Sequence, residues 1–141
     1  MGLNFDYRHL PEKKRKNYIP GYLYHNIITV IFAANMGYAK ERGKLEKLTA
    51  KIAGLDVYNE KNFDILNDVH EKYSHTVRIL KNKESETFGE LYSKELQEVK
   101  DGRKTVKESE TDEVRQQNFI QYKNIILSAI DKTIQATKGS L

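Results

Sequence analysis

The chain has 141 residues, of which 38% are hydrophobic and 31% are charged, so it is long enough for one domain with a modest core. It contains no cysteine, which excludes disulfides and thiolate chemistry, and its longest apolar run, residues 27–34, falls well short of the roughly 20 residues that cross a bilayer. The net charge of +4 is concentrated in the first third, over residues 1–20 and 40–51. We therefore expect a single domain over residues 1–141, in the cytoplasm and without a membrane partner.

The N-terminal segment, residues 1–20, is basic and holds the only two prolines of the chain. A proline disfavours the helical conformation in the residue before it, so we expect a short helix between Pro11 and Pro20. Its cations are Lys13, Lys14, Arg15 and Lys16, and Tyr18 follows them.

An apolar helix is predicted to start near Gly21. Its apolar residues cover most of the circumference, which is typical of a helix buried at the centre of a fold. Gly37 and Gly43 are expected to loosen or end it. A second helix then follows, with Gly54 as its C-terminal stop. The apolar face of this second helix consists of Leu45, Leu48 and Ile52.

The next helix is predicted to begin after Asn59, a good N-cap, with Glu60 in the favourable first turn. Its apolar residues recur at spacings of three and four, which is a heptad seam. We expect this seam to contact a larger protein or a second copy of the chain. It consists of Phe63, Leu66, His70, Tyr73, Val77 and Leu80.

The same helix carries "HEKYSH", which has one residue more than the His-Glu-x-x-His pattern of zinc proteases. Histidines five positions apart in a helix point about 140° from each other, so His70 lies on the seam and His75 nearly opposite. Asp68, Glu71 and His75 share the outer face, whereas metal sites in bundles need inward ligands from several helices. We therefore predict no metal ligand, and a hydrogen-bond partner for a buried His70.

The last third is predicted to hold two helices. The first is a weakly amphipathic helix over residues 88–99. Residues 100–113 contain Val106 as their only apolar residue and are predicted to be a mobile connector or a solvated extension of the helix. Ser109 and Asp112 form a predicted capping pair for the last helix. The apolar stripe of that helix consists of Phe119, Tyr122, Ile126, Ile130 and Ile134.

No segment shows the sustained alternation that is typical of strands, so the predicted fold class is all-α. We expect a helical bundle of four to five main helices. Residues 60–100 and 110–137 are candidates for a long C-terminal helical hairpin.

Residues that carry catalytic chemistry are scarce. The chain has no Gly-x-Ser-x-Gly elbow, and Gly37 and Gly43 lack the spacing of a phosphate-binding loop. Leu45 also stands where such a loop requires Ser or Thr. We therefore predict no catalytic residue, no metal and no cofactor, and a protein that is not an enzyme.

Two basic clusters with nearby tyrosines are more informative. Lysine and arginine neutralise phosphates, while tyrosine stacks on bases or hydrogen-bonds the backbone, so the clusters predict contact with DNA or RNA. The predicted nucleic-acid-binding residues are Lys13, Lys14, Arg15, Lys16, Tyr18, Lys40, Arg42, Lys44 and Lys47.

The stretch "VIFAANMGYAKERGKLEKL", residues 30–48, joins an apolar helix to a basic turn and a second helix. It resembles a segment of small proteins encoded beside bacterial DNA phosphorothioation (Dnd-type) defence genes. Glu41 and Glu46 depart from the more continuous basic turn of that family, and its proline before the second helix is missing. The resemblance implies an accessory subunit of an antiphage system that acts on or near DNA, without catalytic residues. It is carried by Phe32, Ala33, Ala34, Gly37, Tyr38, Lys40, Arg42 and Lys44.

Three functions follow from the sequence. The first is a non-catalytic accessory protein of a prokaryotic defence system or mobile element, which contacts nucleic acid through its basic N-terminal third and a larger protein through its helical faces. The second is a pure protein–protein module, such as a phage-encoded inhibitor or an assembly subunit, whose positive charge meets an acidic partner. The third, which the sequence supports least, is a metal-dependent enzyme.

Overall fold

The computed structural model describes residues 38–139. The chain divides into two units, residues 1–40 with Leu141 and residues 41–140, and the described residues of the second unit form a helical bundle. The prediction of one domain over the whole chain therefore stays a prediction for the first forty residues.

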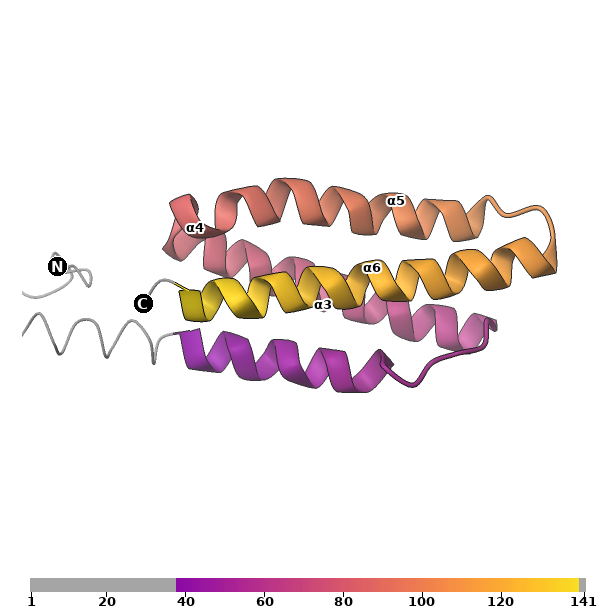
Figure 1. The fold of residues 1–141 in the computed structure, drawn as a ribbon, viewed down its shortest axis with the longest axis horizontal. Coiled ribbons are helices and arrows are strands. Elements are labelled where there is room, and N and C mark those ends of the chain that lie inside the picture. The colour runs from indigo at the N-terminus through magenta and orange to yellow at the C-terminus, as the bar shows by residue number, and fades with distance from the viewer. Residues whose placement is uncertain (1–37, 140–141) are drawn as a thin grey trace, which may run out of the picture. The chain divides into compact units, whose positions relative to one another are not determined.

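The described residues are helical except at the connections, and none of them lies in a strand, which confirms the all-α prediction. Because α4, a π-helical turn (η2) and α5 follow one another without a break, they form one rod, and four rods lie side by side (Figure 1). The elements are the helix over residues 38–52, α3 (Glu60–Lys83), α4 (Ser85–Glu90), η2 (Leu91–Glu95), α5 (Leu96–Lys107) and α6 (Asp112–Gly139).

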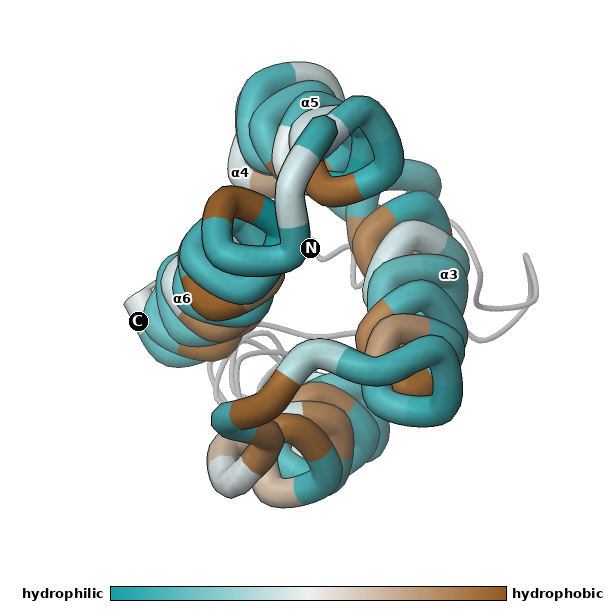
Figure 2. Tube along the Cα trace, turned by 90° about the vertical axis from the view of Figure 1, so that its right-hand side faces the viewer, coloured by the Kyte–Doolittle hydropathy of each residue, from teal (hydrophilic) through white to brown (hydrophobic). Residues whose placement is uncertain are grey.

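Viewed end-on, the four rods surround a common centre (Figure 2). The α5 rod lies diagonally opposite residues 41–52, and α3 and α6 lie between them. Successive rods run antiparallel because each connection is short. This arrangement places α3 and α6, but not α5, beside residues 41–52.

The helix boundaries confirm several local predictions. The Asn59 side chain accepts a hydrogen bond from the Asn62 backbone N–H at 2.7 Å and thereby caps α3. The first described helix ends at Ile52, and Gly54 lies in the turn that follows. Gly43, by contrast, is inside this helix and does not end it. A Cβ built at Gly43 meets nothing within 4 Å, so neither packing nor geometry requires glycine there.

The segment 60–100 is divided in the structure. The α3 helix ends at Lys83, and Glu84 turns the chain into α4, where the Thr87 hydroxyl donates to the Glu84 carboxylate. The long hairpin is therefore formed by α5 with α6, while α3 packs beside it. No glycine or proline marks the break at Glu84, so the spacing of residues does not reveal it.

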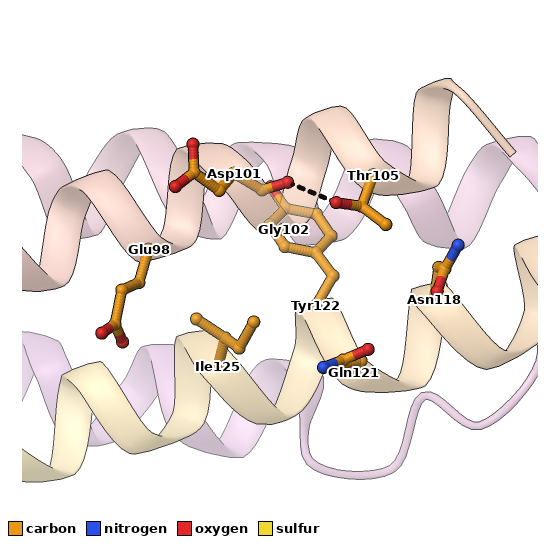
Figure 3. A pocket seen from close by; sticks show the side chains of 8 residues that line it. All are labelled: Glu98, Asp101, Gly102, Thr105, Asn118, Gln121, Tyr122 and Ile125. Carbon is orange, nitrogen blue, oxygen red and sulfur yellow. Dashed lines mark hydrogen bonds between the residues drawn. The ribbon is translucent and has the colours of Figure 1, made fainter.

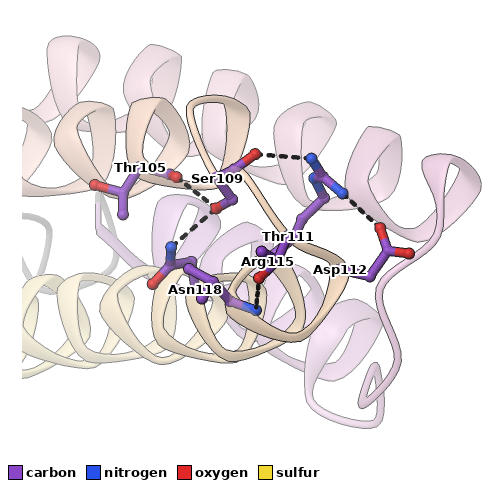
Figure 4. A network of polar contacts seen from close by, with 7 residues as sticks. Thr105, Ser109, Thr111, Asp112, Arg115 and Asn118 are labelled. Atoms are coloured by element: carbon purple, nitrogen blue, oxygen red, sulfur yellow. Dashed lines mark hydrogen bonds and ion pairs between the residues drawn. The ribbon is translucent and has the colours of Figure 1, made fainter.

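Of the two predicted forms, residues 100–107 adopt the helix extension, because α5 continues to Lys107, but Gly102 and Val106 are buried, so this part of α5 packs against the bundle. A turn over residues 108–111 then joins α5 to α6, and a network of polar contacts holds it (Figure 4). Asn118 donates to the Ser109 hydroxyl at 2.9 Å, and Arg115 donates to the Ser109 carbonyl oxygen at 2.8 Å. The cap of α6 is Thr111, whose hydroxyl accepts from the Val114 N–H at 3.1 Å, and not the predicted pair of Ser109 and Asp112.

The heptad seam of α3 forms part of the core. Its residues from Leu66 to Leu80 are buried, and Phe63 is half-buried against the same cluster. Helix 41–52, α5 and α6 contribute the other side of this cluster. A side chain that the chain's own helices cover has no free surface for a partner. The seam is therefore the core-facing stripe of α3, and not the partner-binding surface that the sequence predicts.

The α5 and α6 helices approach closely at Gly102. A Cβ at this position would lie 3.1 Å from Tyr122 Cδ1 and 3.4 Å from Ile125 Cδ1, so the missing side chain allows the contact. A shallow cleft of about 360 Å³ flanks this contact (Figure 3). Its lining consists of Glu98, Asp101, Gly102, Thr105, Asn118, Gln121, Tyr122 and Ile125.

Candidate anion-binding groove

The candidate site is a groove between residues 41–52 and the outer face of α3. It has a volume of about 540 Å³, and we call it the lysine groove. Both walls are helices. The apolar residues on the inner face of each helix fix its rotation and therefore determine which side chains point outward. The groove is lined by Lys44, Lys47, Leu48, Asp68, Glu71, Lys72, His75 and Thr76.

One wall is a row of lysines. Lys44, Lys47 and Lys51 are exposed and follow one another at spacings of three and four, so they lie on one face of the helix. From Lys44 to Lys51 the helix rises about 10 Å. Leu45, Leu48 and Ile52 are buried on the neighbouring face, and this burial fixes the rotation of the lysine row.

The opposite wall is the outward face of α3. Asp68 accepts salt bridges from Lys51 at 3.2 Å and from Lys72 at 2.9 Å, and both lysine ammonium groups contact the same oxygen, Oδ2. The hydrogen bonds from Lys72 and then from Lys51 hold the pKa of the Asp68 carboxyl below its usual value. Asp68 therefore stays ionised and ties the two walls together.

Lys44 and Lys47 make no ion pair with any residue in the described part of the chain. Both are exposed, whereas other basic side chains pair with carboxylates on a neighbouring helix, as Lys51 does with Asp68, or in a connection, as Lys123 does with Asp56. The groove lining therefore contains two ammonium groups without an ion pair, Lys44 and Lys47, together with Lys72, whose partner Asp68 also binds Lys51 from beyond the lining. The carboxylate of Glu71 lines the groove as well. Lysine ammonium groups of this kind are suited to contact anions, including phosphate groups.

The structure separates the predicted nucleic-acid-binding residues into four groups. Lys44 and Lys47 line the groove, and Lys40 is exposed. Arg42 is half-buried, and its Nε donates to the Thr137 hydroxyl at 3.2 Å, so this guanidinium supports the packing of α6. Lys13, Lys14, Arg15, Lys16 and Tyr18 lie outside the described residues.

Lys72 and His75 line the groove and were not in the prediction, nor was Lys51, which reaches the site through its ion pair with Asp68. The spacing of Lys51 from Lys44 and Lys47 carries a usable signal, because all three share one helical face. Lys72 and His75 carry none, since only the pairing of α3 with residues 41–52 brings them to the groove. Helical periodicity indicates which face is outward but not which helix lies beside it.

The outward group of Asp68, Glu71 and His75 lies in this groove and does not form a metal-ligand cluster. Among residues 38–139, no group of three histidine, aspartate or glutamate side chains has the arrangement to hold a metal ion. Asp68 is instead engaged by two lysines. The predictions of no catalytic residue and no metal stay predictions for the chain as a whole.

His70 lies on the far side of α3 from the groove and is buried. As expected, it has a hydrogen-bond partner: its Nδ1 lies 3.1 Å from the Tyr122 hydroxyl. That hydroxyl donates to Asn67 Oδ1 at 2.9 Å, so the hydrogen of the first bond belongs to His70 Nδ1. Of the two histidines in "HEKYSH", His70 therefore lies in the core and His75 lines the groove.

Among residues 38–139, no helix is long and apolar enough to span a membrane. Comparison with protein-family models, with curated proteins and with solved structures finds no match to this chain.

Proposed function

We propose that this protein is a non-catalytic helical accessory protein that contacts the phosphate backbone of nucleic acid through the lysine groove. The observation that carries the proposal is the pair of exposed lysines, Lys44 and Lys47, which have no ion pair among the described residues and stand in one row with Lys51. Lysines three or four residues apart on one helical face, with Cβ atoms about 5–6 Å apart, suit a ligand with regularly spaced negative charges.

The charge distribution supports the same proposal. Basic residues exceed acidic ones in residues 41–52, whereas acidic residues exceed basic ones over residues 53–139. A polyanion is therefore attracted more strongly to residues 41–52 than to residues 53–139 as a whole. The basic residues 13–16 add to the positive charge of the first third. The groove lining contains no asparagine, glutamine or arginine, the side chains that most often read base edges, so we expect binding with little sequence preference.

The test is charge reversal in the lysine row. Lys44→Glu with Lys47→Glu should weaken binding of a labelled DNA duplex by more than about tenfold at low salt, because two phosphate contacts are lost and two repulsive charges appear. The slope of log K against log salt concentration should become shallower by about 2. Fluorescence anisotropy over a range of salt concentrations measures both quantities, and a parallel series with RNA of the same sequence separates the two nucleic acids.

The matched control is Lys104→Glu with Lys107→Glu on α5. These lysines are also exposed, also three residues apart, and belong to the rod diagonally opposite residues 41–52. The control changes the net charge of the protein equally but should leave most of the affinity intact. Equal losses in the two double variants would show that only net charge matters and would contradict a localised site.

Reversal of the N-terminal cations to glutamate, at Lys13, Lys14, Arg15 and Lys16, should weaken binding further. If the unmodified protein binds neither nucleic acid at low salt, the proposal is wrong. The alternative, in which the positive face meets an acidic protein, would then be favoured.

A further inference from the structure

The carboxylate of Asp68 lines the lysine groove and contacts two ammonium groups. One of its oxygens, Oδ2, lies 3.2 Å from the Lys51 ammonium group and 2.9 Å from that of Lys72. A phosphate oxygen held by two lysines would have the same two neighbours at the same kind of distance. The carboxylate also carries one negative charge, as does a phosphodiester.

We propose that Asp68 is a specificity-determining residue of the groove, an internal anion that competes with phosphate for Lys51 and Lys72. This inference rests on the proposed function, because it takes the phosphodiester backbone as the ligand. When a phosphate displaces the carboxylate, one anion replaces another at the same two lysines, so this exchange adds little binding free energy. The net gain comes from Lys44 and Lys47, which have no such partner within the described chain.

The consequence is selection by the number of charges on the ligand. An isolated phosphate ion that enters the groove competes with Asp68 for one pair of lysines. A polymer that contacts Lys44 and Lys47 at the same time adds interactions that Asp68 does not oppose. The groove therefore favours a polyanion over a monoanion, and the affinity for the polyanion is held below the level that four free lysines would give.

The geometry of the carboxylate supports an exchangeable contact. The side chain of Asp68 is 46% exposed, and those of Lys51 and Lys72 are 47% and 58% exposed, so a ligand reaches all three groups from solvent. Ion pairs with this exposure are weak, and water or another anion replaces them readily. Glu41 shows the contrast, because its carboxylate is buried where it meets Lys83 at 3.2 Å.

The experiment is the substitution Asp68→Asn, compared with Asp64→Asn. Both remove one negative charge from α3. Asp64 is exposed, lies one helical turn earlier, and has no ion pair with another described residue. For the labelled DNA duplex, Asp68→Asn should raise the affinity by about three- to tenfold at low salt, since two exposed ion pairs no longer compete. The slope of log K against log salt should become steeper by between about 1 and 2. Asp64→Asn should change the affinity by less than about twofold.

The direction in which the DNA affinity changes distinguishes the role of Asp68 as a competing anion from a purely structural role. If Asp68 only holds residues 41–52 against α3, its removal loosens the groove, and the affinity falls or stays the same. Thermal unfolding of Asp68→Asn, followed by circular dichroism, monitors that packing in the same samples. A higher affinity together with a steeper salt slope supports the inference. An affinity equal to that of Asp64→Asn overturns it.

The result also distinguishes the two proposals. If Asp68→Asn binds like the unmodified protein while Lys44→Glu with Lys47→Glu loses binding, only the inference about Asp68 fails. If neither the unmodified protein nor Asp68→Asn binds DNA or RNA, both proposals fail. If binding is seen only with Asp68→Asn, the internal anion is supported and the proposed function of the unmodified chain is overturned.

Discussion

His70 is a single buried side chain whose protonation state affects the stability of the whole core. It stands at a seam position where the heptad pattern favours an apolar residue. Its ring lies edge-on to that of Tyr122, with the two ring centroids 6.2 Å apart. Burial, followed by the positive charges of Arg103 and Lys100, lowers the pKa of His70 from 6.5 to about 4. The folded protein therefore holds His70 neutral at pH values where an unfolded chain begins to protonate it.

A dependence of stability on pH follows. Because the pKa of His70 is lower in the folded state, the unfolded state binds more protons between pH 6.5 and about 4, and the free energy of unfolding falls as the pH is lowered through this window. The loss should be on the order of 2 kcal/mol by pH 4. His70→Leu should remove it and be more stable than the unmodified protein near pH 4, while Tyr122 keeps its bond to Asn67.

Urea unfolding at several pH values measures this effect. His75→Gln serves as the matched control, since it removes an exposed histidine from the same helix. If the free energy of unfolding depends on pH in the same way in the unmodified protein and in His70→Leu, groups other than His70 cause the pH dependence.

At the scale of the elements, the contact between α5 and α6 depends on one glycine. Tyr122 Cδ1 would lie 3.1 Å from a Cβ at position 102, and the Tyr122 hydroxyl also reaches His70 and Asn67 on α3. A shift of this ring therefore disturbs two helix pairs at once. Gly43, in the first described helix, has no such neighbour.

The two glycines predict opposite results. Gly102→Ala should lower the free energy of unfolding by about 1–3 kcal/mol, because the new methyl group forces Tyr122 and Ile125 to move. Gly43→Ala should raise it by roughly 0.5–1 kcal/mol, since alanine is the better helix former and the space is open. Urea unfolding monitored by circular dichroism gives both values. Stabilisation by Gly102→Ala would contradict the close contact.

The elements also show where the sequence is informative. Periodicity predicted α3, its buried seam and the apolar stripe of α6, because burial repeats with the helical period. It missed the break at Glu84, which has no glycine or proline signal, and it left open whether residues 100–107 continue the helix. It also did not predict the groove, whose walls are about 20 residues apart in sequence and meet only through tertiary packing.

At the scale of the whole molecule, the described bundle completes its own core. The seam of α3 contacts residues from the first described helix, α5 and α6, so the chain does not need a second copy to bury it. The apolar stripe that suggested a partner surface therefore contributes to folding. Contacts with a larger protein remain a prediction for other surfaces.

A substitution in the seam tests this assignment. Val77→Ala should lower the free energy of unfolding by about 1–3 kcal/mol, because Val77 is fully buried and the smaller side chain leaves a cavity. The loss should be the same over at least a tenfold range of protein concentration, since the contact is intramolecular. Thermal unfolding at the two ends of that range checks it. A loss that shrinks as the concentration rises would place the seam in an interface between chains.

The helix that carries the lysine row and α5 lie diagonally opposite each other in the described bundle (Figure 2). With nucleic acid along the lysine groove, the outer surface of α5 would stand roughly 20 Å away, the width of two helices. A protein bound there would meet no phosphate, and the exposed side chains of α5 include the carboxylates of Glu98 and Asp101 as well as the ammonium groups of Lys104 and Lys107. The bundle would then act as a rigid spacer, which holds a second macromolecule at a fixed distance from the nucleic acid without touching its bases.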